Sequence, residues 1–236
     1  MKITSLKNDK VKYWVNLKNK KFRDQEKVFL VEGDHLISEA KKYGEILEYI
    51  SITDEQADYF VTKEIMQKIS AQKSISNSVA VVKFLKPKEI SSRILILDNL
   101  QDPGNLGTII RSAVAFNFTD IILSNESVDI YNSKVIRATE GMLFKVNVLR
   151  KDIKLFLSEL KEKNYQIVGT DVENGKTVKN VLKENVAIII GNEGSGVRKE
   201  ILDLCDFSIN LKMNEGCESL NAGVCASIIM YEVNNG

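Results

Sequence analysis

Blocks of apolar and polar positions along the chain predict two successive α/β regions. In the first region the pattern predicts helices over His35–Tyr43 and Lys63–Ser70, and strands over Ile46–Ile52 and Val79–Leu85. The next segment, Leu85–Arg93, holds one of the two prolines and several polar residues, which is typical of a linker. The pattern therefore predicts a small α/β domain over residues 1–88 and a second domain over residues 89–236.

Beyond the linker, short β-rich runs alternate with helical stretches. The predicted elements are strands at Arg93–Leu97, Asp120–Leu123, Tyr165–Gly169, Val186–Ile190 and Phe207–Leu211, with a helix over Asp152–Lys163 among the segments between them. Such alternation predicts a mostly parallel sheet covered by helices on both faces, so the predicted fold class is α/β.

The first strand of the second domain leads into a turn with Pro103 and Gly104, and then into a helix that begins close to Asn105. At about 100° per residue one arc of this helix is apolar, and the other arc holds Asn105 and Arg111. We therefore expect both side chains to avoid the buried stripe. Two interpretations are open. Either Asn105 is a helix cap and Arg111 a surface cation, or both residues belong to a functional site.

The segment VAIIIGNEGSGV is an apolar strand followed by a turn with three glycines, where backbone N–H groups can approach a ligand closely. A dinucleotide site needs its glycine turn after the first strand of a βαβ unit, and a P-loop ends in Gly-Lys-Ser or Gly-Lys-Thr. The segment fits neither pattern. Its one acid, Glu193, either braces the loop near the following helix or takes part in chemistry.

The third segment, INLKMNEGCESLNAGVCASIIMYEV, predicts a strand, an irregular loop and a helix. Ser219 stands where the N-cap of that helix is expected, and Asn221 falls in its first turn. Taken alone, Asn221 is either an ordinary polar residue at a helix end or part of a site.

Charge is distributed unevenly although the whole chain has a formal net charge of +1. Residues 1–28 contain nine Lys or Arg and three acids, which permits binding to a polyanion such as RNA but also fits a solvated helical face. Tyr13, Trp14 and Phe22 lie among these cations. They could stack on bases or anchor the core.

Composition argues against several other classes of protein. The three cysteines (Cys205, Cys217 and Cys225) are odd in number and form no CxxC pair, and His35 is the only histidine, so we expect neither disulfides nor a metal site. No apolar run approaches the roughly 18 to 20 residues that span a bilayer, and the N-terminus lacks a signal peptide's hydrophobic centre. We expect a cytoplasmic protein without a membrane segment.

Three segments together resemble the three motifs of the SpoU (TrmH-type) family of RNA ribose 2′-O-methyltransferases, a branch of the SPOUT superfamily. They are NLGTIIRSAVAFN (residues 105–117), GNEGSGV (residues 191–197) and ESLN (residues 218–221). The N-terminal stretch, with ITSLKNDKVKYW and FLVEGDHLISEA, is similar to the RNA-binding domain found in front of such catalytic domains, which resembles kink-turn-binding ribosomal proteins.

The resemblance implies S-adenosylmethionine as cofactor, a homodimer and a C-terminal trefoil knot in the catalytic domain. Gly191, Leu211 and Leu220 match positions that line the cofactor pocket. The polar active-site positions are matched by Asn105, Arg111, Glu193, Ser219 and Asn221. In one departure from the family pattern this chain has Lys212 and Glu215 before ESLN, with glycine shifted to Gly216, so the adenine-side loop is expected to differ in shape.

For the mechanism we expect Arg111 to remain protonated and to stabilise a developing alkoxide and the neighbouring phosphate. Glu193 is the chemically easier base, and the identity of the proton acceptor is open. The N-terminal domain favours ribosomal RNA over transfer RNA, because the shortest tRNA-directed members lack this style of domain. The alternatives are a tRNA 2′-O-methyltransferase and a non-catalytic RNA-binding or assembly protein that keeps the fold.

Overall fold

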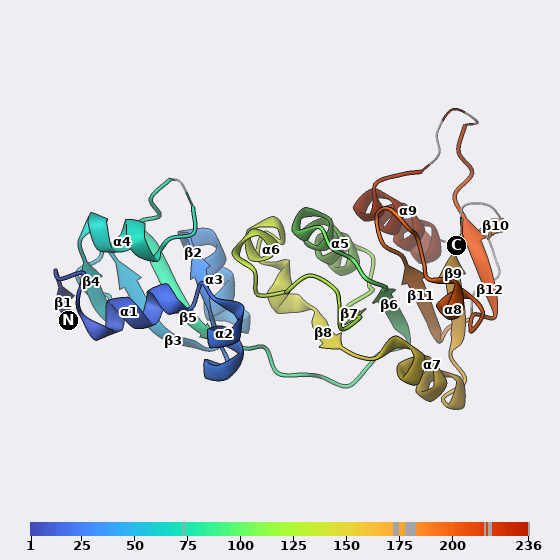
Figure 1. The fold of residues 1–236 in the computed structure, drawn as a ribbon, viewed down its shortest axis with the longest axis horizontal. Helices are drawn as coiled ribbons and strands as arrows, with labels where there is room; N and C mark the ends of the chain where they lie inside the picture. The colour runs from blue at the N-terminus through green and yellow to red at the C-terminus, as the bar shows by residue number, and fades with distance from the viewer. Residues whose placement is uncertain (73, 172–174, 178–182, 215, 217–218, 236) are drawn as a thin grey trace. The chain divides into compact units, whose positions relative to one another are not determined.

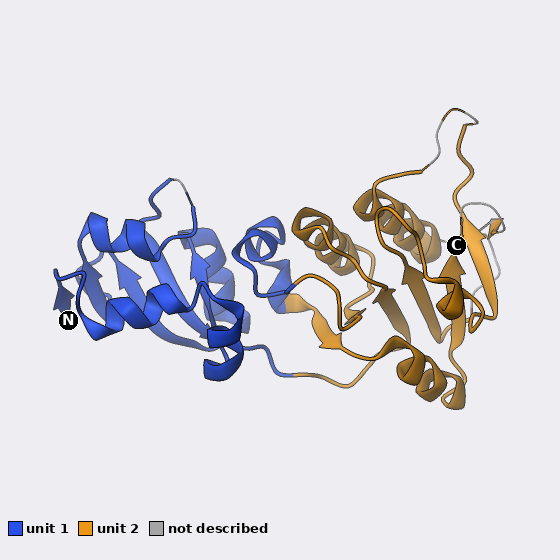
Figure 2. Cartoon of the chain, in the orientation of Figure 1, with its two compact units in different colours: residues 1–86, 129–144 blue, residues 87–128, 145–236 orange. Residues whose placement is uncertain are grey.

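The computed structural model describes residues 1–235 except 73, 172–174, 178–182, 215 and 217–218 (Figure 1). The chain divides into two compact units (Figure 2). Unit 1 comprises Met1–Lys86 and Asp129–Phe144, and unit 2 comprises Pro87–Val128 and Lys145–Gly236. No helix in the described part of the chain is both long and apolar enough to cross a membrane.

Unit 1 contains a five-stranded mixed sheet. Its strands lie in the order β1 (Lys2–Ile3), β4 (Tyr59–Val61), β3 (Ile46–Ser51), β5 (Ser78–Lys83) and β2 (Val28–Glu32). Strand β5 runs antiparallel to both of its neighbours, and the other pairs are parallel. The helices of the N-terminal stretch are α1 (Asp9–Asn16), α2 (Lys20–Glu26), α3 (Asp34–Tyr43) and α4 (Lys63–Ile69).

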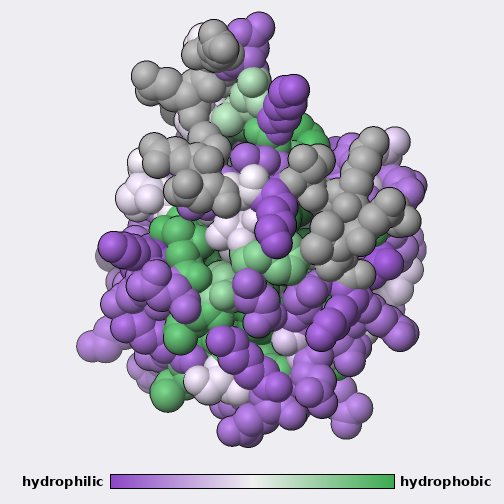
Figure 3. Space-filling model, turned by 90° about the vertical axis from the view of Figure 1, so that its right-hand side faces the viewer, coloured by the Kyte–Doolittle hydropathy of each residue, from purple (hydrophilic) through white to green (hydrophobic). Residues whose placement is uncertain are grey.

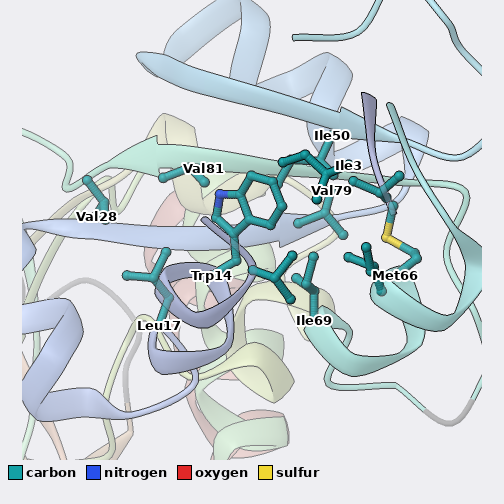
Figure 4. Close-up of a cluster of buried hydrophobic side chains, with 12 residues drawn as sticks. Ile3, Trp14, Leu17, Val28, Ile50, Met66, Ile69, Val79 and Val81 are labelled. Atoms are coloured by element: carbon teal, nitrogen blue, oxygen red, sulfur yellow. The ribbon is translucent and has the colours of Figure 1, made fainter. Parts of the chain in front are cut away.

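Trp14 on α1 lies at the centre of the unit 1 core, among aliphatic side chains from the sheet and from α4 (Figure 4). Its side chain is fully buried, and its indole N–H donates to Glu48 Oε2 at 2.6 Å. Tyr13 and Phe22 are partly buried and pack against the same cluster. The interpretation of Trp14 as a base-stacking residue is therefore wrong, because its rings are enclosed by the core.

The segment Asp129–Phe144 follows the second strand of unit 2 in sequence but belongs to unit 1 (Figure 2). It carries helix α6 (Ser133–Ala138) and the start of the short 3-10 helix η1 (Met142–Lys145). Arg23 donates to Asp129 Oδ2 at 2.5 Å, and both side chains are largely buried. The sequence analysis did not anticipate this assignment.

Tyr131 anchors the same segment in an aromatic cluster. Its ring centroid lies 4.0 Å from that of Phe84 and 4.5 Å from that of Phe29. The amide of Leu85 donates to the Tyr131 hydroxyl oxygen at 2.9 Å. Burial raises the pKa of Tyr131 to about 12, so the hydroxyl is neutral across the physiological range.

Unit 2 contains a seven-stranded sheet in which every pairing between described strands is parallel, which confirms the mostly parallel α/β prediction. Its strands lie in the order β10 (Lys176–Thr177), β12 (Phe207–Asn210), β9 (Gln166–Thr170), β11 (Val186–Ile190), β6 (Arg93–Leu97), β7 (Asp120–Leu123) and β8 (Asn147–Arg150). The helices are α5 (Pro103–Ala115), α7 (Ile153–Glu162), α8 (Lys199–Leu202) and α9 (Ala222–Asn235).

The central strands β6 and β11 are almost entirely apolar because both of their faces are buried. Ile94 and Ile189 pack into one cluster with Leu157 of α7 and Ile201 of α8. Helices α5 and α9 lie together on one side of the sheet (Figure 1). At the end of unit 2 that faces the viewer in Figure 3, hydrophobic residues gather near the middle and hydrophilic residues surround them. Part of the apolar content of unit 2 therefore reaches the surface there.

Helix α9 packs along the arc of α5 that the sequence predicts to be polar and unburied. The hydroxyls of Ser112 and Ser227 lie 2.7 Å apart. A Cβ added to Gly223 would lie 3.3 Å from Thr108 Cβ, so glycine permits the close approach of the two helices. The prediction that Asn105 avoids burial is wrong, since this residue is only 7% exposed, whereas Arg111 on the same helix is exposed as predicted.

Candidate active site

Glu193 lies in the loop that follows β11, and its carboxylate gathers hydrogen bonds from several segments. Oε1 accepts from Asp102 N and from Asn105 Nδ2, both at 3.0 Å. Oε2 accepts from Gln101 N at 3.3 Å and from Asn192 Nδ2 at 3.4 Å. Although partial burial raises the pKa of the Glu193 carboxyl, the hydrogen bonds outweigh burial and leave this pKa below its ordinary value.

Asn105 connects Glu193 to the third motif. Its Nδ2 donates to Glu193, while its Oδ1 accepts from Asn221 Nδ2 at 2.8 Å. Asn221 Oδ1 in turn accepts from the amides of Gly223 and Val224. One residue from each of the three predicted motifs therefore takes part in a single hydrogen-bonded chain.

The start of α9 differs from the prediction. Asn221 immediately precedes this helix and its side chain accepts from the first-turn amides, so it acts as the N-cap. Ser219, the predicted cap, lies two residues earlier in the loop. The prediction misplaced the cap because serine and asparagine are nearly equivalent caps by propensity, and only the chain path distinguishes them.

Arg111 lies six residues after Asn105 on α5 and is exposed. Within the described residues its guanidinium forms no hydrogen bond or ion pair, so the structure does not connect it to the Glu193 network. An exposed guanidinium without a protein partner remains available to an anionic group of a ligand.

A cavity of about 490 Å³ opens beside Glu193, within the range of roughly 300–1,000 Å³ that is common for small-molecule sites. Gly191, Leu211 and Leu220, the three predicted cofactor-binding residues, all line it, together with Glu193 and Ser219. Asn105, Arg111 and Asn221 are not among its lining residues. The structure thus brings together five of the eight predicted site residues around one cavity, and Asn105 and Asn221 join them through Glu193.

Gly191 occupies a position that no other residue fits. A Cβ built there would lie 2.0 Å from the carbonyl carbon of Gly196 and 2.1 Å from the amide nitrogen of Val197. Asn192 and Gly196 exchange backbone hydrogen bonds of 2.9 and 3.0 Å, so the loop folds tightly back on itself. Close approach of the loop's own backbone explains the glycine, whereas the predicted approach of backbone N–H groups to a ligand stays a prediction.

Comparison with known proteins places this site in context. Residues 92–231 match the model of the SpoU rRNA Methylase family, and residues 8–80 match an MRM3-like substrate binding domain. The chain is 33% identical over 243 residues to a 23S rRNA (guanosine(2553)-2′-O)-methyltransferase, RlmP, of Bacillus subtilis, with 98% of both chains covered. The chain belongs to the SpoU rRNA methylase family.

Solved structures agree with this membership along the whole chain. A crystal structure described as an RNA 2′-O ribose methyltransferase superposes with a TM-score of 0.83 at 25% identity, covering 100% of this chain and 98% of the other. An AdoMet-bound rRNA methyltransferase from Sinorhizobium meliloti superposes with a TM-score of 0.89 at 24% identity, covering 100% and 97%. At 24% identity, the similarity to the Sinorhizobium meliloti protein establishes a shared fold and not a shared function.

The loop in which this SpoU chain departs from the family pattern is described in part. Met213 lines the cavity and Lys212 is exposed beside it. Gly216 lies in an exposed turn, whereas Glu215, Cys217 and Glu218 fall outside the described residues. The expected difference in loop shape therefore stays a prediction.

One ion pair that the sequence analysis missed fixes the base of the second SpoU motif. Asp98, fully buried at the end of β6, accepts from Arg198 Nε at 2.9 Å and from Nη2 at 2.6 Å, and also from the Arg198 amide. The hydrogen bond to Asp98 raises the pKa of Arg198. The sequence did offer a signal for Asp98: it is an acid directly after an apolar strand, and functional residues often lie at the carboxyl ends of parallel strands.

The described residues contain no group of three or more His, Cys, Asp or Glu side chains that could hold a metal ion. Cys205 is partly buried, and burial raises the pKa of its thiol to about 11. At neutral pH this thiol is protonated and therefore a poor nucleophile.

Proposed function

We propose that this protein methylates a ribose 2′-hydroxyl in RNA, with ribosomal RNA as substrate and S-adenosylmethionine as methyl donor. The observation that carries the proposal is the hydrogen-bonded chain Glu193–Asn105–Asn221, whose Glu193 lines the same cavity as Gly191, Leu211 and Leu220. Full-length similarity to a protein named as a 23S rRNA 2′-O-methyltransferase supports ribosomal RNA over transfer RNA.

The cavity fits S-adenosylmethionine in size and chemistry. Backbone of the glycine turn and apolar side chains such as Ile190, Leu211 and Leu220 form its walls, which suits the adenine ring. When bound, the cofactor supplies an electrophilic methyl group on a sulfonium. This chain's residues must hold the ribose oxygen in line with that group and help to remove its proton.

Arg111 is proposed to act on the RNA side of the reaction. Its exposed guanidinium binds the phosphate next to the target ribose and stabilises negative charge that develops on the 2′-oxygen. Asn105, Asn221 and Ser219 position the substrate through hydrogen bonds. In this role Arg111 keeps its proton throughout, as expected for a guanidinium.

Glu193 is proposed to hold Asn105 and the loop 99–102 in place and not to accept the proton. Its carboxylate already receives four N–H groups. Those of Asn105, Asp102 and Gln101 lower its pKa, so the anion is a weak base. A positioning role agrees with the interpretation of Glu193 as a loop brace. The proton acceptor is then a group outside the Glu193 network.

Residues 1–88 are proposed as the RNA-substrate-binding domain and residues 89–236 as the catalytic domain. The match of residues 8–80 to a substrate-binding domain supports the first assignment, as does the excess of Lys and Arg over acids in residues 1–28. With Trp14 enclosed in the core, RNA binding by this domain relies on exposed cations and backbone groups.

Labelled S-adenosylmethionine and 23S ribosomal RNA transcribed in vitro test the function directly. We expect label to enter one ribose, and a transcript with a 2′-deoxyribose at that nucleotide to bind without accepting label, because the reacting oxygen is missing. Label in the deoxy transcript would point to a base as target. Transfer to tRNA alone, or cofactor binding without any transfer, would favour the tRNA enzyme or the non-catalytic protein, respectively.

The C-terminal trefoil knot is also proposed. Strand β12 pairs with β9, and α9, which follows β12 in sequence, packs on α5, which follows β6. Membership of the SpoU family, and not sequence periodicity, carries the proposal of a knot.

We further propose a cytoplasmic homodimer. Val224, Ile228 and Tyr231 lie on one face of α9 at helical spacing and are 44%, 38% and 52% exposed. Such an apolar stripe on a soluble enzyme is typical of a surface that another protein covers. A second copy is the proposed partner, and ribosomal RNA in the cytoplasm is the proposed substrate.

A further inference from the structure

Arg150, the last residue of β8, holds an irregular loop of unit 2 through its guanidinium. Nη1 donates to the carbonyl oxygens of Ser124 at 2.6 Å, Asn125 at 2.8 Å and Ser127 at 2.9 Å, and Nη2 donates to that of Val128 at 2.8 Å. A planar cation with several fixed donors suits a set of converging carbonyl groups, which a lysine could satisfy only in part. Arg150 thus adds four hydrogen bonds to a loop that Leu97 O also holds through Ser124 N and Ser127 Oγ.

The loop 124–128 in turn holds the loop 99–102, which follows β6. Val128 N donates to Leu100 O at 2.8 Å, and Gln101 Nε2 donates to Glu126 O at 2.9 Å. Asn99 has a positive φ of 59°, a left-handed conformation that Asn adopts more readily than most residues other than glycine. Its amide donates to Ser124 Oγ at 3.0 Å, which is a third hydrogen bond between the two loops.

The loop 99–102 supplies the two backbone donors to Glu193, from Gln101 and Asp102. Asp102 also caps α5, because its Oδ1 accepts from Asn105 N at 2.8 Å. A shift of the loop would therefore displace both Glu193 and Asn105.

We infer that Arg150 is a positioning residue for methyl transfer, acting through the loops 124–128 and 99–102 on Glu193 and Asn105. It does not line the cofactor cavity. Only one part of the inference, the effect of Arg150 on the rate of methyl transfer, rests on the proposed function. The structural consequence, a fixed loop 99–102, can be measured whether or not the protein methylates RNA.

The experiment compares Arg150→Ala and Arg150→Lys with Lys151→Ala in the full-length protein. Lys151→Ala is the matched control, because it removes the neighbouring exposed cation but no bond to the loop. Three quantities are measured: hydrogen exchange of the Gln101 and Asp102 amides, kcat at saturating RNA and cofactor, and the dissociation constant of S-adenosylmethionine. Exchange of the β11 amides serves as the internal reference for the intact fold.

In Arg150→Ala we expect exchange at Gln101 and Asp102 to accelerate at least tenfold relative to β11. The kcat should fall on the order of ten- to a hundredfold, since small displacements of positioning groups are costly, with cofactor affinity little changed. Arg150→Lys should recover part of both effects, and Lys151→Ala should show neither. Unchanged exchange at these amides overturns the inference, even if kcat falls. Faster exchange with full kcat would overturn the catalytic consequence and leave the proposed methyl transfer intact.

Discussion

The Glu193 carboxylate collects donors from the loop after β6, from the start of α5 and from its own glycine turn. The sequence offered two meanings for this acid, loop brace or base, and spacing alone could not choose between them. In the structure, N–H groups of residues about ninety positions away donate to the carboxylate, which favours the role of loop brace. A contact at that separation leaves no local signature in the sequence.

The lowered pKa of Glu193 gives a pH dependence with a definite sign. The ionised carboxylate stabilises the folded loops, so its contribution is complete above the ordinary value of 4.5 and is lost as pH falls through the lower folded pKa. We expect the difference in Tm between the natural protein and Glu193→Gln to be constant from pH 8 to pH 5 and to shrink below pH 4.5. A difference that shrinks between pH 8 and pH 6 would contradict this account.

Arg111→Ala should reduce kcat by about a hundred- to a thousandfold, the usual cost of removing a group that stabilises developing charge. Cofactor affinity, measured by calorimetry, should change little because Arg111 does not line the cavity. Arg111→Lys keeps the charge without the planar fork and should retain partial activity. Turnover near the natural rate in Arg111→Ala would remove this residue from the mechanism.

At the scale of the element, α5 shows how far periodicity reaches. The apolar arc of this helix is buried as the pattern predicts, with Leu106, Ile109 and Ile110 fully enclosed. The opposite arc is covered only in part: α9 approaches Thr108 and Ser112, and Ser112 is half-buried, whereas Thr108 and Arg111 stay exposed. Small polar residues allow that contact yet look like a solvated face in the sequence.

Strands were predictable where an apolar β-rich run carries its own signal. In unit 1 the sequence predicts β3 and β5 but not β1, β2 or β4, and in unit 2 it predicts neither β8 nor β10. Strand β11 spans Val186–Ile190 and β6 spans Arg93–Leu97, as predicted, while β12 ends at Asn210, one residue before the predicted end. The start of α9 was misplaced by two residues, since only the loop's path decides whether Ser219 or Asn221 meets the first-turn amides. Local preference thus predicts the elements better than their ends.

The exposed face of α9 predicts a change in association state. Ile228→Lys places a charge in the middle of the apolar stripe and should convert the proposed dimer to a monomer in sedimentation velocity. Leu155→Lys is the matched control, because Leu155 on α7 is 68% exposed but isolated from the stripe. Dissociation in both variants, or in neither, would argue against α9 as the contact.

At the scale of the whole molecule, the order of the chain and its division into compact units do not coincide. Residues 129–144 interrupt the sequence of unit 2 between β7 and β8, yet they contribute to the core of unit 1. Periodicity could not reveal this, because the apolar pattern around a residue such as Phe144 is the same whether the residue packs in unit 1 or in unit 2. The buried Arg23–Asp129 pair joins positions 106 residues apart.

Tyr131→Ala should destabilise unit 1. In sequence, Tyr131 lies among the elements of unit 2, but its ring packs in unit 1. Tyr131 is partly buried, so loss of its ring is expected to cost about 2–3 kcal/mol in the free energy of unfolding, less than for a fully buried aromatic residue. Denaturant unfolding can be followed by Trp14 fluorescence, because this single tryptophan lies in the unit 1 core.

Two further variants serve as controls for Tyr131→Ala. Tyr131→Phe removes only the hydroxyl that accepts from Leu85 N and should cost about 1 kcal/mol. Leu47→Ala, at a leucine that is 45% exposed in the same unit, should stay within about 0.5 kcal/mol. Equal losses in Tyr131→Ala and Leu47→Ala would mean that residues 129–144 add little to unit 1.

The contribution of residues 129–144 to unit 1 has a consequence for protein engineering. A fragment cut after Lys86 would leave Phe29 and Phe84 without the ring that covers them and would bury Arg23 without its counter-ion. Grafting the front domain of one relative onto the catalytic half of another would create the same mismatch. In a working chimera, the segment equivalent to residues 129–144 must come from the same relative as the front domain.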